Sequence, residues 1–137
     1  MQLDAYLHFN GNCEEALTFY ASALSGKIEG LHRFEGSPME QEVGEANKRR
    51  VMHATLVAGD VKLMASDSVP SHQHHGGEES NVSLSLGTSD AAEADRVFAA
   101  LSQGGKVTMP LEPVFWGGRF GMLTDRFGIS WLMSAGH

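Results

Sequence analysis

The hydrophobic and polar residues of the chain follow two periods, a period of two that is typical of strands and a period near 3.6 that is typical of helices. Residues 4–10 are rich in aromatic side chains, which predicts a short strand. The segment that follows carries apolar residues at helical spacing: Ala16, Leu17, Phe19, Tyr20, Ala23 and Leu24. Asn12 and Glu15 have the spacing of a capping box, and Ser25-Gly26 supplies an end, so we expect a helix from Asn12 to about Leu24.

Three more strands are predicted in the first half of the chain. Residues 27–34 and 50–58 have the composition of strands. Gly59-Asp60 is typical of a two-residue hairpin turn and leads into a returning strand over 61–66. Residues 36–47 contain a proline and several acidic or amide side chains, and we expect them to form a flexible loop.

The same order of elements starts again after a stretch rich in glycine and histidine. Strict alternation predicts a strand over 81–86, where the odd-numbered residues are polar. Thr88-Ser89-Asp90 offers N-caps for a helix over 91–103, whose apolar positions are Ala94, Val97, Phe98 and Leu101. A further strand is expected to begin at Lys106 and to be interrupted by Pro110 and Pro113.

The end of the chain predicts a hairpin of two short strands around a tight turn at Asp125–Gly128. We expect the Asp125 carboxylate to bond the backbone of the turn and Gly128 to supply its positive φ. A turn of four residues places Leu123 opposite Ser130. In that register Leu123 and Leu132 share one face of the hairpin.

This order amounts to an internal repeat. A first βαβββ module is expected over 1–68 and a second over 81–137, with a His/Gly-rich linker over 69–80 between them. One module has a helix to cover only one face of its sheet. We therefore expect an α+β domain in which the two modules form an incomplete mixed β-barrel around a cleft, with one helix packed outside each module.

Charge and cysteine content narrow the classes of partner and compartment. The net charge is −7, and the longest basic run is Lys48-Arg49-Arg50, so neither nucleic acid nor an anionic membrane surface is an expected partner. The only cysteine is Cys13, which excludes an internal disulfide and fits a reducing compartment. The start of the chain lacks the basic and apolar segments of a signal peptide. We therefore expect a cytoplasmic protein.

Several local motifs, taken together, resemble one known family. They are Phe9-Asn10-Gly11-Asn12-Cys13-Glu14-Glu15-Ala16 running to Phe19-Tyr20, Leu63-Met64-Ala65-Ser66-Asp67, and Phe115-Trp116-Gly117 with Phe120-Gly121 and Asp125-Arg126-Phe127-Gly128. The chain resembles the PhnB-like branch of the glyoxalase/bleomycin-resistance/dioxygenase superfamily, which has the vicinal-oxygen-chelate fold. Some members of that branch carry the label 3-demethylubiquinone 3-methyltransferase. The chain has no glycine-rich strand–turn–helix opening of the kind that a nucleotide-like cofactor needs, so we do not expect that activity.

The resemblance also implies where a metal ion would be held. In metal-dependent members, four side chains on four strands bind a divalent ion, and those positions fall on Ala5, Met64, Asn81 and Leu132 of this chain. Ala and Leu cannot coordinate a metal, Met is too soft for Mn, Fe or Mg, and a single Asn is a weak ligand. We therefore expect no metal site of the family's usual kind and no cofactor.

Strand parity gives an expected lining for the cleft instead. Asn81, Ser83 and Ser85 share the face away from the second helix, and Met64 shares a face with Ser66. The full set of expected ligand-binding residues is Phe9, Met64, Ser66, Asn81, Ser83, Ser85, Trp116, Arg119, Leu123 and Leu132. This mixture of apolar and polar side chains is typical of a small-molecule site.

Several candidate residues, inside and outside this set, also have a purely structural interpretation. Trp131 is expected to pack in the core, whereas Trp116 fits a pocket wall and a packing role equally well. Cys13 lies at a helix N-terminus, where a thiol pKa falls, but no base can be placed beside it, so a structural role is favoured over a nucleophile. Arg119 could meet an anionic ligand or be solvated.

The histidines allow similar alternatives. His72, His74 and His75 could bind a transition metal, although a solvated loop is the favoured interpretation for a glycine-rich stretch. His8 and His53 lie on predicted strands without a carboxylate neighbour in the sequence, and we expect them to be packing residues.

Three hypotheses about function remain open at this point. The first is a metal-independent small-molecule-binding protein, expected to be a homodimer. The second is an enzyme of the same superfamily, a lyase, dioxygenase or isomerase or a bearer of the methyltransferase label, that uses polar cleft residues or a non-standard metal site. The third is a fold that is retained only for assembly. The nature of the residues at Ala5, Met64, Asn81 and Leu132 favours the first.

Overall fold

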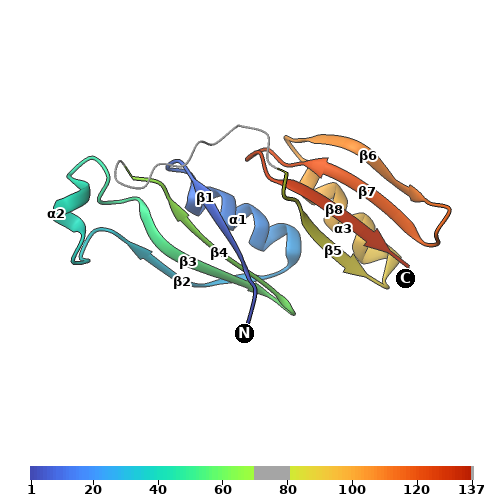
Figure 1. Ribbon diagram of the computed structural model, residues 1–137, viewed down its shortest axis with the longest axis horizontal. Helices are drawn as coiled ribbons and strands as arrows, with labels where there is room; N and C mark the ends of the chain where they lie inside the picture. Colours follow the sequence, from blue (N-terminus) through green and yellow to red (C-terminus); the bar gives the residue numbers. More distant parts are fainter. Residues whose placement is uncertain (70–80, 137) are drawn as a thin grey trace. The chain divides into compact units, whose positions relative to one another are not determined.

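The computed structural model describes residues 1–69 and 81–136, and the first of these ranges belongs to one compact unit and the second to another. Each unit contains one four-stranded mixed sheet and one long helix (Figure 1). The βαβββ repeat predicted from the sequence is therefore confirmed. The cleft expected between the modules stays a prediction, as do the module boundaries.

The first unit has its strands in the order β1-β4-β3-β2. Its elements are β1 (Ala5–Phe9), α1 (Cys13–Leu24), β2 (Lys27–Arg33), the short helix α2 (Glu40–Val43), β3 (Val51–Ala58) and β4 (Val61–Asp67). The strand β1 pairs in parallel with β4, and β3 pairs antiparallel with both of its neighbours. This arrangement brings the first and last strands of the unit side by side.

The second unit repeats this topology with the order β5-β8-β7-β6. Its elements are β5 (Leu84–Thr88), α3 (Ala91–Ser102), β6 (Lys106–Pro113), β7 (Arg119–Thr124) and β8 (Ser130–Ala135). Here β5 pairs in parallel with β8. The strand predicted over 81–86 begins later than expected, so Asn81 and Ser83 lie ahead of β5.

The second helix buries the whole apolar stripe that the sequence predicted, and the first buries it except for Phe19 and Leu24, which are half-buried. On α1 the buried residues are Cys13, Ala16, Leu17, Tyr20 and Ala23, and on α3 they are Ala94, Val97, Phe98 and Leu101. The helices lie against one face of their own sheets, where alternate residues of β4, β7 and β8 are also buried. The core of each unit therefore lies between its helix and its sheet.

The N-terminus of α1 is capped differently from the prediction. Asn12 makes no side-chain capping bond, so the expected capping box with Glu15 is wrong. The carboxylate of Asp67, at the end of β4, accepts hydrogen bonds of 2.9 Å from the backbone N–H groups of Gly11 and Cys13. Because β4 lies beside β1, a residue more than 50 positions away satisfies donors that a local cap would otherwise bind.

The segment predicted as a flexible loop, 36–47, contains the helix α2. Val43 is buried there with Phe34 and Val69, and Met39 and Met52 pack against this cluster. The prediction failed because the polar residues of the segment outnumber the apolar residues that fix it. The cluster also includes the first residue of the predicted linker, while 70–80, including His72, His74 and His75, lies outside the described residues.

The two prolines of β6 do not interrupt the strand as expected. The strand runs from Lys106 to Pro113, and register shifts at Val107–Met109 and Met109–Glu112 accommodate the prolines. Since β6 is an edge strand, a residue without an N–H costs it no interior ladder bond. A proline that would end a central strand is therefore tolerated here.

The final hairpin has a longer turn than predicted, and this changes which side chains share a face. Thr124 pairs with Ser130, so the loop contains five residues and Leu123 lies opposite Trp131. The Asp125 carboxylate accepts from the backbone N–H groups of Phe127 and Ile129, as expected, and also from the indole Nε1 of Trp131 at 2.7 Å. This buried anchor lengthens the turn and shifts the register by one residue.

No helix among residues 1–69 and 81–136 is long and apolar enough to cross a membrane.

Candidate functional site

The two faces of the first sheet differ in chemistry. On the face that α1 covers, the strands bury small and aliphatic side chains: Ala54, Leu56, Leu63 and Ala65. Alternation places polar and titratable side chains on the open face, among them Tyr6, His8, His53, Thr55 and Lys62. The open face is where this unit presents chemical groups.

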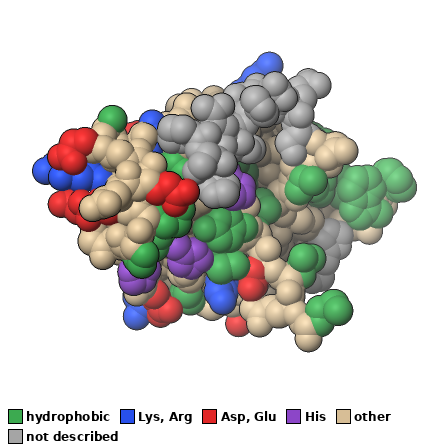
Figure 2. All heavy atoms as spheres, turned by 60° about the vertical axis from the view of Figure 1, so that its left-hand side comes forward, with side chains coloured by type: hydrophobic (Ala, Val, Ile, Leu, Met, Phe, Trp, Pro, Cys, Tyr) green, Lys and Arg blue, Asp and Glu red, His purple; other side chains and the backbone are tan. Residues whose placement is uncertain are grey.

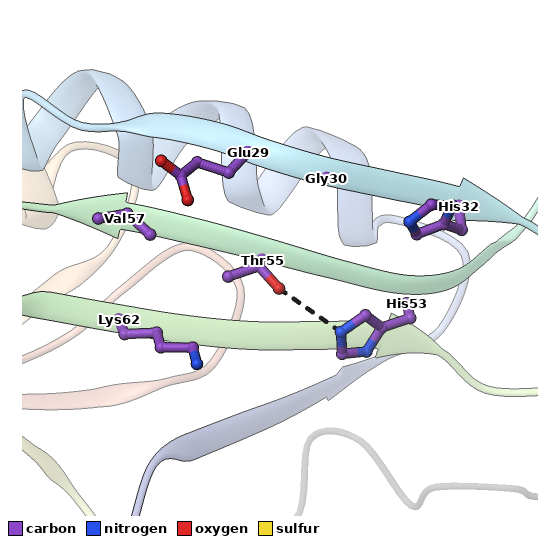
Figure 3. Close-up of a pocket in the computed structure, with 7 residues that line it drawn as sticks. All are labelled: Glu29, Gly30, His32, His53, Thr55, Val57 and Lys62. Atoms are coloured by element: carbon purple, nitrogen blue, oxygen red, sulfur yellow. Dashed lines mark hydrogen bonds between the residues drawn. The ribbon is translucent and has the colours of Figure 1, made fainter.

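A hollow of about 350 Å³ lies on the open face over β2, β3 and β4. Its lining consists of Glu29, Gly30, His32, His53, Thr55, Val57 and Lys62 (Figure 3). The volume is at the lower end of the range of about 300–1,000 Å³ that is typical of small-molecule sites. In the described part of the chain, all the lining residues belong to the first unit.

The register of the strands explains how these residues come together. His32 and His53 are direct partners on β2 and β3, and Gly30 is the partner of Thr55. A Cβ added at Gly30 would meet only His32 Nε2, at 3.8 Å, and the backbone of Gly30 is not in the left-handed region. The missing side chain at this position therefore opens space above Thr55.

An array of aromatic rings adjoins the hollow at His53. The Tyr6 hydroxyl lies 3.1 Å from His53 Nδ1, and the two ring centroids are 5.7 Å apart. The His8 ring also contacts Tyr6, with a centroid distance of 5.1 Å. Figure 2 shows histidine side chains at the surface beside hydrophobic and charged ones. Tyr6 therefore reaches across β4 and connects β1 to β3.

Within residues 1–69 and 81–136, the two charged residues of the hollow have loose ionic partners. Lys62 Nζ lies 3.9 Å from an Asp4 carboxylate oxygen, and the Glu29 carboxylate lies 3.9 Å from Lys27 Nζ. The side chains of Lys62 and Glu29 are 43% and 50% exposed. Exposed pairs at this distance contribute little free energy, so either charge can turn toward a ligand at small cost.

In the first unit, the residues predicted to bind a ligand lie on two faces. Met64 and Ser66 are on the open face, as expected, opposite Tyr6 and His8 of β1. Phe9 pairs with Asp67 and is buried on the face that α1 covers, so its predicted place beside Met64 is wrong. The prediction exchanged the two faces of β1, because the apolar residues of this strand face the helix.

The second unit likewise separates the predicted residues. Ser85 and Leu132 are direct partners on the face away from α3, as expected. Leu123 lies on the opposite face, buried beside Trp131, and Arg119 forms an ion pair with Asp95 on α3. The predicted placement of these last two beside Leu132 is therefore wrong, and the change of hairpin register is the reason.

Three other predicted residues lie outside the strands. Asn81 is exposed ahead of β5, and Ser83 bonds Ser130 at 2.8 Å between hydroxyl oxygens. Trp116 is 54% exposed in the loop before β7 and makes edge contacts with Phe115 and Phe120. The described structure places none of them at the hollow.

The positions carried over from metal-dependent proteins do not form a donor set. Ala5 is the partner of Leu63, whereas Met64 is the partner of Tyr6, so Ala5 and Met64 point to opposite faces of the first sheet. Within 1–69 and 81–136, no group of three or more His, Cys, Asp or Glu residues is placed to hold a metal ion. The residues present therefore do not fit the divalent ion of this fold.

Cys13 has the structural role favoured by the sequence. The side chain is completely buried at the start of α1. Burial raises the pKa of the Cys13 thiol to about 12, and the negative charges of Asp67 and Glu14 add to the shift. A thiol that stays protonated at neutral pH is a poor nucleophile.

The sequence alone did not identify most residues of the hollow. His53 was interpreted as a packing residue, and Glu29, His32 and Thr55 were not singled out. A signal was present in the sequence, since the strongly apolar side chains of Leu7 and Phe9 favour the face that the helix covers. Alternation along the strand then places Tyr6 and His8 on the open face.

Comparisons with known proteins agree on one family. The model of a family described as 3-demethylubiquinone-9 3-methyltransferase matches residues 2–134. The chain is 44% identical to PA1353 from Pseudomonas aeruginosa, whose crystal structure superposes with a TM-score of 0.85 and covers 98% of this chain and 97% of that one. Over 144 residues it is 28% identical to Protein YjdN of Escherichia coli K12, covering 98% of this chain and 95% of the relative.

Two further solved structures have a similar fold. A PhnB protein from Bacillus cereus, described as a putative 3-demethylubiquinone-9 3-methyltransferase, is 28% identical with a TM-score of 0.78, over 98% of this chain and 99% of that one. The fosfomycin resistance protein FosX from Listeria monocytogenes superposes with a TM-score of 0.68 at 9% identity, over 100% of this chain and 93% of that one. The likeness to FosX concerns the fold alone.

Proposed function

The chain belongs to the 3-demethylubiquinone-9 3-methyltransferase family, a PhnB-like branch of the vicinal-oxygen-chelate superfamily, and from this we propose that it is a metal-independent protein that binds a small molecule in the hollow on its first sheet. The observation that carries the proposal is the open face itself. One side of the sheet is covered by α1, and the other presents a hollow of about 350 Å³ with apolar, hydroxyl, imidazole and charged groups directed into it. These groups can orient a small polar molecule through hydrogen bonds and opposite charges.

Metal independence is supported by the chemistry of the donor set. At the four positions carried over from metal-dependent members the chain has Ala5, Met64, Asn81 and Leu132, and the first two do not share a face. Hard divalent ions need several oxygen or imidazole ligands that converge. We therefore assign ligand recognition to side chains alone.

The methyltransferase activity in the family's description is not part of this proposal. A nucleotide-like cofactor would use the turn between a first strand and its helix, where backbone N–H groups are available. In this chain Gly11 and Cys13 donate those N–H groups to the carboxylate of Asp67. The N–H groups that a phosphate would need are therefore already bound by the carboxylate of Asp67.

A thermal-shift screen of aromatic and amphipathic metabolites tests ligand binding. Its matched variant is Gly30→Val, which fills the hollow from β2 without entering the core. We expect ligands that raise the melting temperature of the wild type and do not raise that of Gly30→Val. The absence of any ligand from a broad panel, or equal responses from both proteins, would contradict the proposal and favour a fold kept for assembly alone.

Metal analysis tests the second part of the proposal. Protein purified without a metal-affinity step is dialysed against Mn²⁺, Zn²⁺ or Fe²⁺ and then measured for bound metal. We expect less than stoichiometric metal. One tightly held divalent ion per chain would overturn metal independence and leave ligand binding to be judged by the screen.

A metal-free acid–base enzyme is the second candidate function. The contact of 3.1 Å between the Tyr6 hydroxyl and His53 Nδ1 favours it, because such a partner fixes the orientation of an imidazole. Among the described residues, the other nitrogen, Nε2, has a single long contact of 3.5 Å, with the Thr55 hydroxyl. Conversion of a bound ligand that is lost in His53→Ala and kept in Tyr6→Phe at reduced rate would support this function over binding alone.

We also propose that the protein is a cytoplasmic homodimer. A single buried cysteine fits a reducing compartment, and two copies of a two-module chain can complete each other's sheets. Sedimentation equilibrium measures the assembly state directly. A monomer at micromolar concentration would contradict the dimer and would leave the hollow, which one unit forms, unaffected.

A further inference from the structure

We propose that the hollow takes an aromatic α-amino acid, or a ligand with the same three groups: a carboxylate, an ammonium and an aromatic ring. This inference rests on the proposed binding function and specifies its ligand class. Three observations carry it, namely the placement of two opposite charges, the ring array beside the hollow, and the size of the hollow.

The two charges stand on either side of one strand. Lys62 on β4 is the register partner of Val57 on β3, and Glu29 lies on β2 beside the same part of β3. Figure 3 shows both charged side chains at one end of the hollow with Val57 between them. A ligand whose carboxylate meets Lys62 and whose ammonium meets Glu29 satisfies both charges at once.

A ligand with a single charge fits this end less well. A simple acid would bind Lys62 and leave the Glu29 carboxylate close to its own negative charge. A simple amine would have the reverse conflict with Lys62. Because the charges of the hollow sum to zero when its histidines are neutral, a zwitterion is the charge type that complements it.

The opposite end of the hollow suits a ring. Thr55 lies two residues beyond Val57 on the same face, a step of about 7 Å along a strand, and His53 follows after another such step. That first step is comparable to the distance from an α-carbon to the far end of an aromatic side chain. The His53 ring lines the hollow there and is in contact with the Tyr6 ring behind it in the array, and aromatic rings favour offset or edge contacts with one another.

The absence of a side chain at Gly30 leaves the space above Thr55 open for that ring. The Thr55 hydroxyl and the exposed imidazole of His32 lie at the same end. They offer hydrogen-bonding partners to a polar ring substituent such as a phenol hydroxyl. A phenolic amino acid should therefore bind more tightly than its unsubstituted counterpart.

The test is a series of titrations by calorimetry with the full chain. The probes are L-tyrosine and L-phenylalanine, with three analogues of L-phenylalanine that each lack one group: N-acetyl-L-phenylalanine, L-phenylalaninamide and L-cyclohexylalanine. We expect binding of both amino acids and a loss of about tenfold or more for each missing charge, since charge-assisted hydrogen bonds are the strong ones. The saturated ring should bind several-fold more weakly.

Two variants assign each charge to its group. Glu29→Gln should remove the preference for L-phenylalanine over its N-acetyl derivative, and Lys62→Met should remove the preference over its amide. Lys106→Met changes an exposed lysine of the other unit and should preserve both preferences. Preferences that survive in Glu29→Gln and Lys62→Met would overturn the assignment.

The outcome for the ligand class is separable from that for the proposed function. Another ligand that binds the wild type and is blocked by Gly30→Val, with no response to either amino acid, overturns the zwitterion proposal alone. A panel without any ligand overturns both. Binding of the amino acids that Gly30→Val does not weaken overturns the location.

Discussion

Replacing Asp67 by Asn tests the long-range contact that fixes the start of α1. The Asp67 carboxylate is buried and accepts three backbone hydrogen bonds of 2.9 Å, two at Oδ1 from Gly11 and Cys13 and one at Oδ2 from Val51. Asparagine has the same shape and keeps one carbonyl oxygen. Its amide nitrogen carries only donors, so it faces the Val51 N–H without accepting its proton.

The expected loss of stability follows from replacing the carboxylate oxygen that accepts from Val51 by an amide nitrogen. A hydrogen bond to a charged group contributes about 1.5–3 kcal/mol, and a buried N–H left without an acceptor costs about 1–3 kcal/mol. We expect the free energy of unfolding to fall by about 3 kcal/mol. With an unfolding entropy of about 2.1 cal/mol/K per residue over 137 residues, the melting temperature should fall by about 10 °C.

The matched control is Asp90→Asn at the N-terminus of α3. Asp90 also accepts two backbone N–H bonds, from Ala92 and Glu93, but it is exposed and caps its own helix. Because Asn is as good an N-cap as Asp, this variant should lose less than about 0.5 kcal/mol.

Urea denaturation followed by circular dichroism measures the unfolding free energies of both variants and the wild type. The slope of free energy against urea should be the same for all three, which shows that the native state has kept its compactness. A cost for Asp67→Asn within 0.5 kcal/mol of that for Asp90→Asn would refute the role given to Asp67. A second readout is thiol reactivity, because removing the negative charge of Asp67 should lower the pKa of Cys13.

Three further predictions follow from the fold. Because the pKa of Cys13 is raised to about 12 in the folded state, iodoacetamide at pH 8 should label it only after unfolding, and labelling of the native protein would contradict this. The free energy of unfolding should also fall as the pH rises from about 9 to 12, because in that range the unfolded chain has released a proton that the folded chain keeps. Leu123→Ala should cost about 2–5 kcal/mol in urea denaturation while Leu132→Ala costs under about 1.5 kcal/mol, since only the first side chain is fully buried, and equal costs would contradict the hairpin register. Gly105→Ala should lower the melting temperature by several degrees, because its Cβ would lie 2.3 Å from the Thr124 carbonyl oxygen, whereas Gly30→Ala should change it little; a neutral Gly105→Ala would refute the close approach.

The fold followed from the sequence where one short segment carried the whole signal. The apolar stripe of α3 and its cap at Asp90 both lie within a few residues, and both were found as predicted. The Gly59-Asp60 turn is as local, because its two residues alone determine the hairpin between β3 and β4. The helix α2 was missed because Val43 owes its burial to Phe34 and Val69, which come from elsewhere in the chain.

The candidate site was predicted less well, for a related reason. Which residues face outward on a strand depends on its register and on which face the helix covers, and a shift of one residue exchanges the faces. The turn at Asp125 was one residue longer than expected, and Leu123 moved to the core as a result. On β1 the two faces were exchanged in the prediction, so Phe9 was expected to bind the ligand and Tyr6 was not.

The sequence by itself determined the repeat of two βαβββ modules, the apolar faces of both helices, the family, and the residue types at Ala5, Met64, Asn81 and Leu132. These are properties of residue type and short-range spacing. Only the tertiary structure decided that Asp67 caps α1 and that Glu29, His53 and Lys62 surround one hollow. These depend on strand pairing between distant segments, which the local pattern of the chain does not contain.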